Sequence, residues 1–271
     1  MSPKNKTHRR QDSRGYSGPS RNNSRSAPTP PLPPGEGWGE GIRTRAMSTK
    51  TLAAAALALV FASAPAFAVK PFSADYQASY MGIAGVGKMT LEPQGGDKWK
   101  YTLSVGSGGI QLNQNTVFED KGGQLRPLSG RDSALLLIKK SDKTANYDWD
   151  KGVATWGGDV KPERSGPVKL QSGDVDGLLL NLAIARDVAA GKPLNYRLVD
   201  EGRVKQVSFK VAGKEAITIG GQSKQATKVV QTNGEGKQIT AWVVDGMPVP
   251  ARILQRKDGK DDIDLQVKAV H

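Results

Sequence analysis

Pairs of aspartates are the side chains of this 271-residue chain best suited to chemistry. Asp148 and Asp150 stand two residues apart on an expected strand, so their carboxylates are predicted to share one face of a sheet. Two facing carboxylates can hydrolyse a glycosidic bond, one as the acid and the other as base or nucleophile. Because this spacing is also common on a solvated strand beside a turn, we expect both side chains to be exposed and without a catalytic role.

Other acidic residues are better explained by local structure. Asp174 and Asp176 precede an amphipathic run, and we expect Asp174 to be the N-cap of a helix whose N-terminus both carboxylates favour. An acidic group around Gly259 lacks the residue order and the terminal Glu of a calcium-binding loop, so we expect a polar hairpin there. Its acidic members are Asp258, Asp261, Asp262 and Asp264.

Basic and indole side chains are weaker candidates for a binding site. Lys139 and Lys140 are adjacent, and a second basic group lies near the C-terminus. Either could meet an anionic lipid or glycan, but surface cations are usually just solvated. The second group consists of Arg252, Arg256 and Lys257. A tryptophan at alternating positions is more often buried in the core than part of a ligand groove. We therefore expect core positions for Trp149, Trp156 and Trp242.

The composition excludes the common nucleophilic and zinc chemistries. The chain has no cysteine, and its two histidines are His8 and His271, the last residue. A Ser-His-Asp or Cys-His site needs an imidazole beside the nucleophile, and a zinc site of the usual kind needs His or Cys ligands. The phosphate-binding pattern G-x-x-x-x-G-K-[ST] is also absent. We therefore predict no catalytic, cofactor-binding or metal-binding residues, no cofactor and no enzymatic activity.

The segment from Met47 to Ala68 has the features of a secretory signal peptide. Lys50 forms a short positive region, Leu52–Ala62 is an apolar run, and Ala66–Ala68 is an A-x-A cleavage site. A membrane anchor is the alternative, but the run is shorter than the about 20 residues that span a bilayer. We predict cleavage before Val69, a periplasmic location and no membrane-spanning segment after cleavage.

Residues 1–46 are rich in Ser, Arg, Pro and Gly and are expected to be disordered. They could be a basic tail for nucleic acid, or translation could start at Met47, which the composition of Thr29–Gly41 favours. Of the 39 Lys and Arg and 26 Asp and Glu, residues 1–46 hold nine and three, and Lys50 is one more basic residue. The remainder keeps 29 basic and 23 acidic residues, a net charge of +6, so we expect no nucleic-acid binding.

Residues 69–271 are expected to form one mainly β domain. Alternation with period two marks Phe72–Tyr80 and Trp99–Val105 as half-buried strands. Turns such as Glu201–Gly202 and Asp258–Gly259 supply the positive φ that tight hairpins need. Further short strands are predicted at Lys88–Glu92, Thr116–Glu119, Ser133–Lys139, Ala145–Asp150, Val153–Trp156, Leu194–Asp200, Val204–Ala212, Glu215–Ile219, Thr227–Gln231, Gln238–Val244, Ala251–Arg256 and Ile263–Ala269.

One helix interrupts this series of strands. Apolar residues recur with helical spacing from Val175 to Ala190, followed by Gly191 as a stop and Pro193 as a breaker. A single helix cannot cover both faces of a long sheet. We therefore predict one strongly curved antiparallel sheet, a half-barrel, wrapped around a single amphipathic helix at about 175–190.

Four segments resemble a known family. They are FSADYQASYMGIAGVGKMTLE from Phe72, VFEDKGGQLRPLSGRDS from Val117, the stretch from Gly166 to Arg203 and AWVVDGMPVPARILQ from Ala241. The chain resembles family 3108 of domains of unknown function, which are exported proteins of Gram-negative bacteria, over most of residues 70–268. This resemblance implies a periplasmic protein with a mainly antiparallel sheet, and it implies no catalytic residues.

Three functions remain open from the sequence. The one we expect is a non-catalytic binding or carrier module for an apolar or envelope-derived ligand such as a lipid or acyl chain, because a sheet curved around a helix can enclose an apolar concavity. The first alternative is an envelope glycan or peptide hydrolase that uses paired carboxylates. The second is an envelope scaffold that binds a protein partner through a sheet edge.

Overall fold

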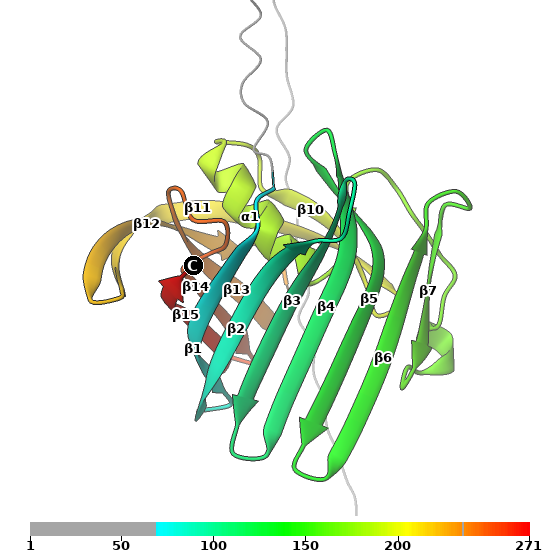
Figure 1. Ribbon diagram of the computed structural model, residues 1–271, viewed down its shortest axis with the longest axis horizontal. Helices are drawn as coiled ribbons and strands as arrows, with labels where there is room; N and C mark the ends of the chain where they lie inside the picture. Colours follow the sequence, from blue (N-terminus) through cyan, green and yellow to red (C-terminus); the bar gives the residue numbers. More distant parts are fainter. Residues whose placement is uncertain (1–68, 235) are drawn as a thin grey trace, which may run out of the picture. The chain divides into compact units, whose positions relative to one another are not determined.

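One large open β-sheet and one α-helix make up the described part of the chain (Figure 1). The computed structural model describes residues 69–234 and 236–271, so the predictions for residues 1–46 and for the leader at 47–68 lie outside the described residues. Within these residues no helix is long and apolar enough to cross a membrane. The prediction of a mainly β fold with a predominantly antiparallel sheet and one helix is confirmed.

The elements have the following bounds: β1 Phe72–Tyr80, β2 Ile83–Pro93, β3 Lys98–Ser107, β4 Ile110–Lys121, β5 Gln124–Leu136, β6 Lys139–Asp148, β7 Val153–Gly158, a 3-10 turn Pro162–Arg164, β8 Val168–Lys169, β9 Asp174–Val175, α1 Leu179–Ala189, β10 Asn195–Asp200, β11 Arg203–Ile219, β12 Gln222–Gln231, β13 Lys237–Val244, β14 Arg252–Lys257 and β15 Lys260–Val270. The order across the sheet is β8-β7-β6-β5-β4-β3-β2-β1-β15-β14-β13-β12-β11-β10-β9. All neighbours are antiparallel apart from β9 and β10, and no backbone ladder joins β8 to β9 in the described part, so the sheet is not closed.

The strands alternate between the core and the solvent as their sequences predict. On β1, Phe72, Ala74, Tyr76 and Ala78 are buried, and the intervening residues are more exposed. On β3, Tyr101 is fully buried. Since successive side chains point to opposite faces of a sheet, this pattern identifies the inner face on both strands.

Several strands are longer than predicted. The predicted strand Lys88–Glu92 is part of the 11-residue β2, and Thr116–Glu119 is part of the 12-residue β4. Gly85 lies within β2 because β3 passes close to it: a Cβ atom there would lie 2.6 Å from the carbonyl oxygen of Gly106. Glycine at this position therefore permits close approach of two strands and does not form a turn.

Three of the predicted strands are wrong in their boundaries. The predicted strand Ser133–Lys139 spans the end of β5, a turn and the first residue of β6, because Leu137 adopts a φ of +60°. The predicted strands Val204–Ala212 and Glu215–Ile219 are one strand of 17 residues, β11, with a bulge that ends at Gly213. A bulge absorbs one extra residue without ending the strand.

The helix begins four residues later than predicted, at Leu179 instead of Val175. Asp174 is not its N-cap, because Asp174 and Val175 form β9, which pairs in parallel with β10. The carboxylate of Asp176 accepts hydrogen bonds from the amides of Leu178 and Leu179, at 3.1 and 2.8 Å, and so satisfies donors at the helix start.

The main core lies between α1 and both halves of the sheet. Leu179 and Ile184 of the helix are fully buried in one cluster with residues of the first half, including Tyr101. The same cluster contains Val229 and Val267 of the second half. Burying the apolar helix face against both halves of the sheet stabilises the fold by about 25 cal/mol per Å² of apolar area.

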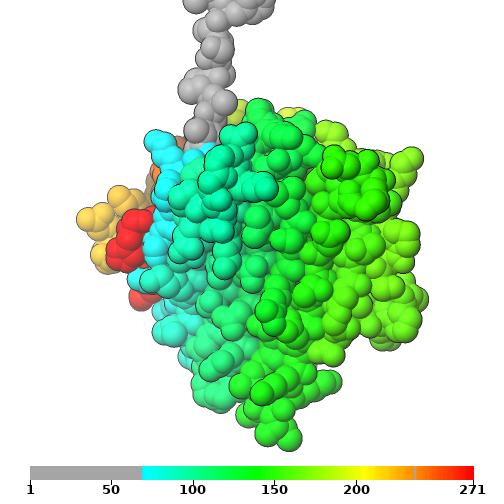
Figure 2. Space-filling model, turned by 45° about the vertical axis from the view of Figure 1, so that its right-hand side comes forward, coloured from blue at the N-terminus to red at the C-terminus, as the bar shows by residue number. Residues whose placement is uncertain are grey.

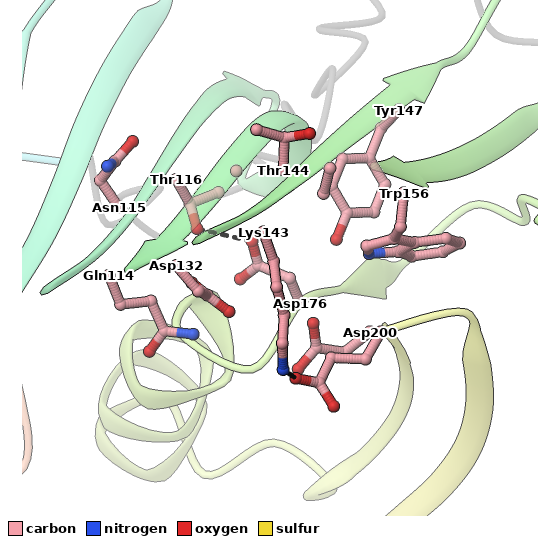
Figure 3. A pocket seen from close by; sticks show the side chains of 13 residues that line it. Gln114, Asn115, Thr116, Asp132, Lys143, Thr144, Tyr147, Trp156, Asp176 and Asp200 are labelled. Carbon is pink, nitrogen blue, oxygen red and sulfur yellow. Dashed lines mark hydrogen bonds and ion pairs between the residues drawn. The ribbon is translucent and has the colours of Figure 1, made fainter. Parts of the chain in front are cut away.

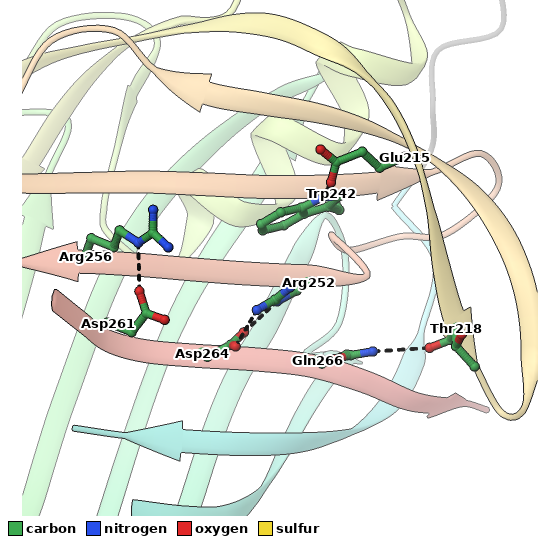
Figure 4. Close-up of polar contacts among 8 residues, drawn as sticks. All are labelled: Glu215, Thr218, Trp242, Arg252, Arg256, Asp261, Asp264 and Gln266. Atoms are coloured by element: carbon green, nitrogen blue, oxygen red, sulfur yellow. Dashed lines mark hydrogen bonds and ion pairs between the residues drawn. The ribbon is translucent and has the colours of Figure 1, made fainter. Parts of the chain in front are cut away.

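A second, smaller core lies on the opposite face of β13, since Trp242 alternates with buried residues of the main core. The end of the β11–β12 hairpin covers this face (Figure 4), and the indole of Trp242 donates to Glu215 at 2.7 Å. Arg252 forms two hydrogen bonds with Asp264, at 2.9 and 2.7 Å. Arg256 pairs with Asp261, so Arg252 and Arg256 are engaged with carboxylates of this sheet, and Trp242 is buried as predicted.

Candidate functional site

The two ends of the open sheet meet through side chains at a contact that we call the seam, between β6–β7 and β10. The hydroxyl of Tyr147 donates to the carbonyl oxygen of Val199 at 3.1 Å, and Lys143 forms an ion pair with Glu201. A small core surrounds this contact, made of Tyr147, Ala154, Trp156, Leu170 and Val199. The seam therefore joins strands that backbone hydrogen bonds leave apart.

A row of polar side chains crosses the inner face of the sheet beside the seam. The register places Gln114 of β4 opposite Asp132 of β5, and Asp132 opposite Lys143 of β6. Thr116 lies two residues further along β4 and so faces the same side. Figure 3 shows that Asp176, just before α1, and Asp200, at the end of β10, lie close to this row.

Asp176 is the most enclosed of these carboxyl groups. It accepts a hydrogen bond from the hydroxyl of Thr116 at 2.6 Å, in addition to the two amides at the helix start. Burial raises the pKa of Asp176 from 3.8 to about 7, and the nearby Asp200 and Asp132 add to the increase, although the hydrogen bonds from Leu179 and Thr116 oppose it. At neutral pH this carboxyl group is therefore poised between its two protonation states.

The pKa values of Asp132 and Asp200 are raised, as is that of Asp176. Burial raises the pKa of Asp132 to about 6, with a further contribution from the charge of Asp200. Burial also raises the pKa of Asp200 above its ordinary value, followed by the charge of Glu201. Three carboxyl groups that each resist ionisation thus lie at the seam, and Lys143 is the cation beside them.

The hollow between these carboxyl groups is small, with a volume of about 20 Å³. Such a volume holds one water molecule and no sugar or peptide. The cluster therefore has the perturbed pKa values that are typical of a catalytic site, but the hollow between its carboxyl groups has no space for a substrate.

A larger cavity of about 350 Å³ adjoins the cluster on the inner face of the sheet. Its walls are mostly apolar and come from β1, β3, β4, β5, β6 and β15. The apolar wall residues include Leu103, Val105, Leu112, Ala134, Ile263 and Leu265. Its polar end shares four residues with the cluster, namely Gln114, Asp132, Lys143 and Glu201. The arrangement is an apolar chamber with charged groups at one end.

Asp148 and Asp150 lie on different elements. Asp148 is the last residue of β6, whereas Asp150 is exposed in the turn that follows, so the two do not share a strand face as predicted. The ammonium of Lys151 lies 2.8 Å from the carboxylate of Asp148 and lowers the pKa of Asp148. Asp174 is fully buried in β9 and pairs with Arg197 at 2.5 Å.

The other predicted residues lie outside the cluster, apart from Trp156 at its edge. Trp156 is buried as predicted, whereas Trp149 is half-buried and donates to the carbonyl oxygen of Pro127 at 2.7 Å. The acidic group near the C-terminus forms the β14–β15 hairpin, as predicted. Lys139 and Lys140 are exposed at the start of β6.

The sequence reasoning missed Asp132 and Asp200. The feature that could have indicated this cluster is a set of polar side chains at inward positions. Gln114 and Thr116 occupy such positions on β4, and Asp132 lies opposite Gln114. An inward polar residue on one strand carries little meaning alone, because a one-residue change of register moves it to the solvent face. Only the partner strands show that these residues converge.

A substitution at Gly177 can measure how tightly the carboxyl cluster is packed. A Cβ atom at Gly177 would lie 2.8 Å from a carboxylate oxygen of Asp200, so Gly177→Ala is expected to displace Asp200 and to lower the free energy of unfolding by about 1–3 kcal/mol. Chemical denaturation measures this loss. Gly106→Ala is the matched control, since nothing lies within 4 Å of a Cβ there, and its stability should change by less than about 1 kcal/mol. Equal effects of the two substitutions would contradict tight packing at Asp200.

Comparison with known proteins gives one family and several distant structures. Residues 75–266 match the family model described as "Protein of unknown function (DUF3108)". Among curated proteins no match is found. A β-barrel-like protein of the domain of unknown function DUF1849 from Brucella abortus is 11% identical, with a TM-score of 0.49, and the alignment covers 74% of this chain and 97% of that chain.

Two further similar structures contain MucB. In the Pseudomonas aeruginosa MucA/MucB complex the matched chain is 10% identical with a TM-score of 0.36, and the alignment covers 74% of this chain and 51% of that chain. A crystal structure of MucB is 9% identical with a TM-score of 0.35, and the alignment covers 76% of this chain and 54% of that chain. The chain thus spans about half the length of these two chains.

Proposed function

Since the chain belongs to the DUF3108 family, whose function is unknown, we propose that it is a non-catalytic binding or carrier module that takes an apolar ligand into the chamber on the inner face of its sheet. The observation that carries the proposal is the cavity of about 350 Å³ with mostly apolar walls. Ligand sites are concave, mostly apolar and have a few placed polar groups, and they fall in a volume range of about 300–1,000 Å³. The leader at 47–68 supports a periplasmic location for this activity.

The helix and the cavity divide the inner face between them. The buried residues of α1 share a core with Tyr101 and Phe118, whereas the walls of the cavity contain no residue of α1. We propose that the sheet acts as a half-barrel that is filled by the helix at one end and left open for a ligand at the other. Apolar side chains such as Val105 and Leu112 remain half-buried there, and a ligand would complete their burial.

The charged end of the cavity favours a ligand with one polar terminus. Lys143 lines the cavity together with Asp132 and Glu201, so a head group that accepts hydrogen bonds can be held while an alkyl chain lies along the apolar walls. A fatty acid or another acyl chain has this chemistry. Asp176 and Asp200 line the hollow of about 20 Å³ and not the cavity, which supports a structural role for them over the hydrolase alternative, whereas Asp132 lines both spaces. A scaffold role finds less support, since the edge strands β8 and β9 have only two residues each.

A binding assay with a fluorescent fatty acid tests the proposal. Dansyl-undecanoic acid is expected to bind the purified protein with enhanced emission, and Ala134→Trp is expected to weaken binding about tenfold or more by filling the apolar cavity. Ala216→Trp is the control, because Ala216 is exposed on β11 and outside the cavity. Absence of binding, or equal binding by both variants once circular dichroism shows that they are folded, would contradict the proposal.

A further inference from the structure

Three hairpin turns come together at the end of the sheet away from α1, at the bottom of Figure 1. We call them the tip surface: residues 80–83 between β1 and β2, 107–110 between β3 and β4, and 136–140 between β5 and β6. The amide of Leu137 donates to the carbonyl oxygen of Gly109 at 3.0 Å, and the hydroxyl of Ser107 donates to the carbonyl oxygen of Ala84. These bonds link the three turns into one surface, and Figure 2 shows this end of the molecule narrowing toward the green β5–β6 region.

The tip surface exposes large apolar side chains to solvent. Ile138 is 96% exposed, Leu137 is 73% exposed and Met81 is 67% exposed. Leu137 and Met81 have φ angles of +60° and +50°, in the left-handed region where Asn and Gly are the favoured turn residues. With Asn or Gly at these two positions, a hairpin in water would be less strained and better solvated. Apolar side chains at strained, exposed positions are typical of sites that contact a non-aqueous surface.

The charges around the tip surface indicate which kind of partner it can bind. Residues 80–83, 107–110 and 136–140 contain no Asp or Glu, but they include Lys139 and Lys140, both exposed. Asp262 of β15 lies beside the first turn, since the amide of Met81 donates to its carbonyl oxygen at 2.8 Å, and its carboxylate accepts a hydrogen bond from Gln255 at 2.8 Å. The nearest acidic residue along β6, Asp142, pairs with Arg131. Exposed apolar side chains next to lysines complement a bilayer with anionic head groups, where each lysine contributes about 1 kcal/mol of binding.

We propose that the tip surface docks on an anionic bilayer, with Leu137, Ile138 and Met81 inserted among the lipids and Lys139 and Lys140 at the head groups. Three narrow, protruding turns suit insertion into a fluid interface better than a protein contact, which needs about 800 Å² of complementary surface on each side. Tyr80 adjoins Met81 and also lines the apolar cavity, so docking would bring the cavity against the lipid phase. The docking does not depend on ligand binding, and either property can hold without the other.

Site-specific labelling tests the proposal directly, because the chain has no cysteine of its own. Ile138→Cys and, as a control, Val211→Cys are labelled with an environment-sensitive fluorophore in the full chain, and the N-terminus of each product is determined by mass spectrometry. Val211 is 60% exposed and lies on β11, five strands from β1 in the sheet. Vesicles of phosphatidylethanolamine and phosphatidylglycerol should shift the emission of the label at 138 to the blue and leave the label at 211 unchanged.

Vesicle flotation of variants supplies the second measurement. Ile138→Ser is expected to weaken binding to these vesicles about tenfold, since one large apolar side chain loses its burial. The double variant Lys139→Gln, Lys140→Gln is expected to weaken it by about fivefold for each charge and to reduce its dependence on salt. Val211→Ser should bind like the parent. The proposal is overturned if both labels respond alike, if Ile138→Ser binds like the parent, or if Ile138→Ser instead abolishes self-association in analytical ultracentrifugation.

Discussion

The free energy of unfolding of the parent is expected to fall as the pH rises from 4 to 8, and Asp176→Asn is expected to remove much of this fall. Asparagine keeps an acceptor for the amides of Leu178 and Leu179. Its NH2 group takes the place of the oxygen that accepts from Thr116, so the Thr116 hydroxyl turns to accept this hydrogen bond. It cannot ionise, so the buried charge never forms. Relative to the parent, the variant should be similar at pH 4, within about 1 kcal/mol. At pH 8 it should be more stable by about 3–4 kcal/mol.

The sign of this effect follows from proton binding. The pKa of Asp176 rises from 3.8 to about 7 on folding, so between these values the folded protein holds a proton that the unfolded chain has released. Stability must then fall as the pH rises through this window, and the penalty is complete above pH 7. Below about pH 3 both states are protonated and this group contributes nothing. Asp132, with a pKa of about 6, adds a smaller effect of the same sign.

Thermal or denaturant unfolding across this pH range measures the effect, and Asp148→Asn is the control. The ammonium of Lys151 lowers the pKa of Asp148, so Asp148 contributes stability above the ordinary pKa that is lost as the pH falls through its lowered value. Its removal should leave the loss of stability toward pH 8 in place. A profile of Asp176→Asn parallel to that of the parent would show that Asp176 is already ionised in the folded protein.

Tyr147→Ala is expected to loosen the seam and to cost about 3–5 kcal/mol of unfolding free energy. The side chain is 4% exposed and packs edge-to-face on Trp156, with 6.0 Å between ring centroids. The seam core holds β6 and β7 against β10 without a backbone ladder. Amide hydrogen exchange should therefore accelerate in β6, β7 and β10 and should change less in β13 to β15.

Tyr147→Phe separates the packing of this ring from its hydrogen bond. It removes only the bond to the carbonyl oxygen of Val199 and should cost about 1 kcal/mol, with the exchange pattern of the parent retained. If Tyr147→Ala accelerated exchange equally in β13 to β15, the seam would not be a local contact and the molecule would unfold as one unit.

Local sequence was sufficient for much of the fold. Residues of β1 alternate between core and solvent because the backbone of a strand turns successive side chains to opposite faces, and this period can be read without knowing the partner strand. The Asp258–Gly259 turn was equally predictable, because both residues take positive φ, at +50° and +78°, which their types favour. The spacing of apolar residues locates the helix, but the prediction of Asp174 as its N-cap is wrong, because Asp174 lies in β9 and Asp176 accepts the amides at the helix start.

The run Leu135–Ile138 shows where local reasoning fails. Nothing in its composition marks a turn, so it was predicted as a strand, yet Leu137 takes a left-handed conformation at the tip of a hairpin. The pairing of β5 with β4 and with β6 fixes this turn. The chain bends there because the strands on either side are already held by their neighbours.

Composition and periodicity are enough to predict a mainly β protein with one helix, no cysteine and a single histidine, His271, in residues 69–271. The meeting of Asp132, Asp176 and Asp200 at the seam, and the chamber that apolar residues of β1, β3, β4, β5 and β15 leave beside them, follow from the folded chain alone. Burial and charge coupling depend on distances between segments that are far apart in the chain. Hydrophobic periodicity records which face of an element is buried, but it contains no information on which other element covers that face.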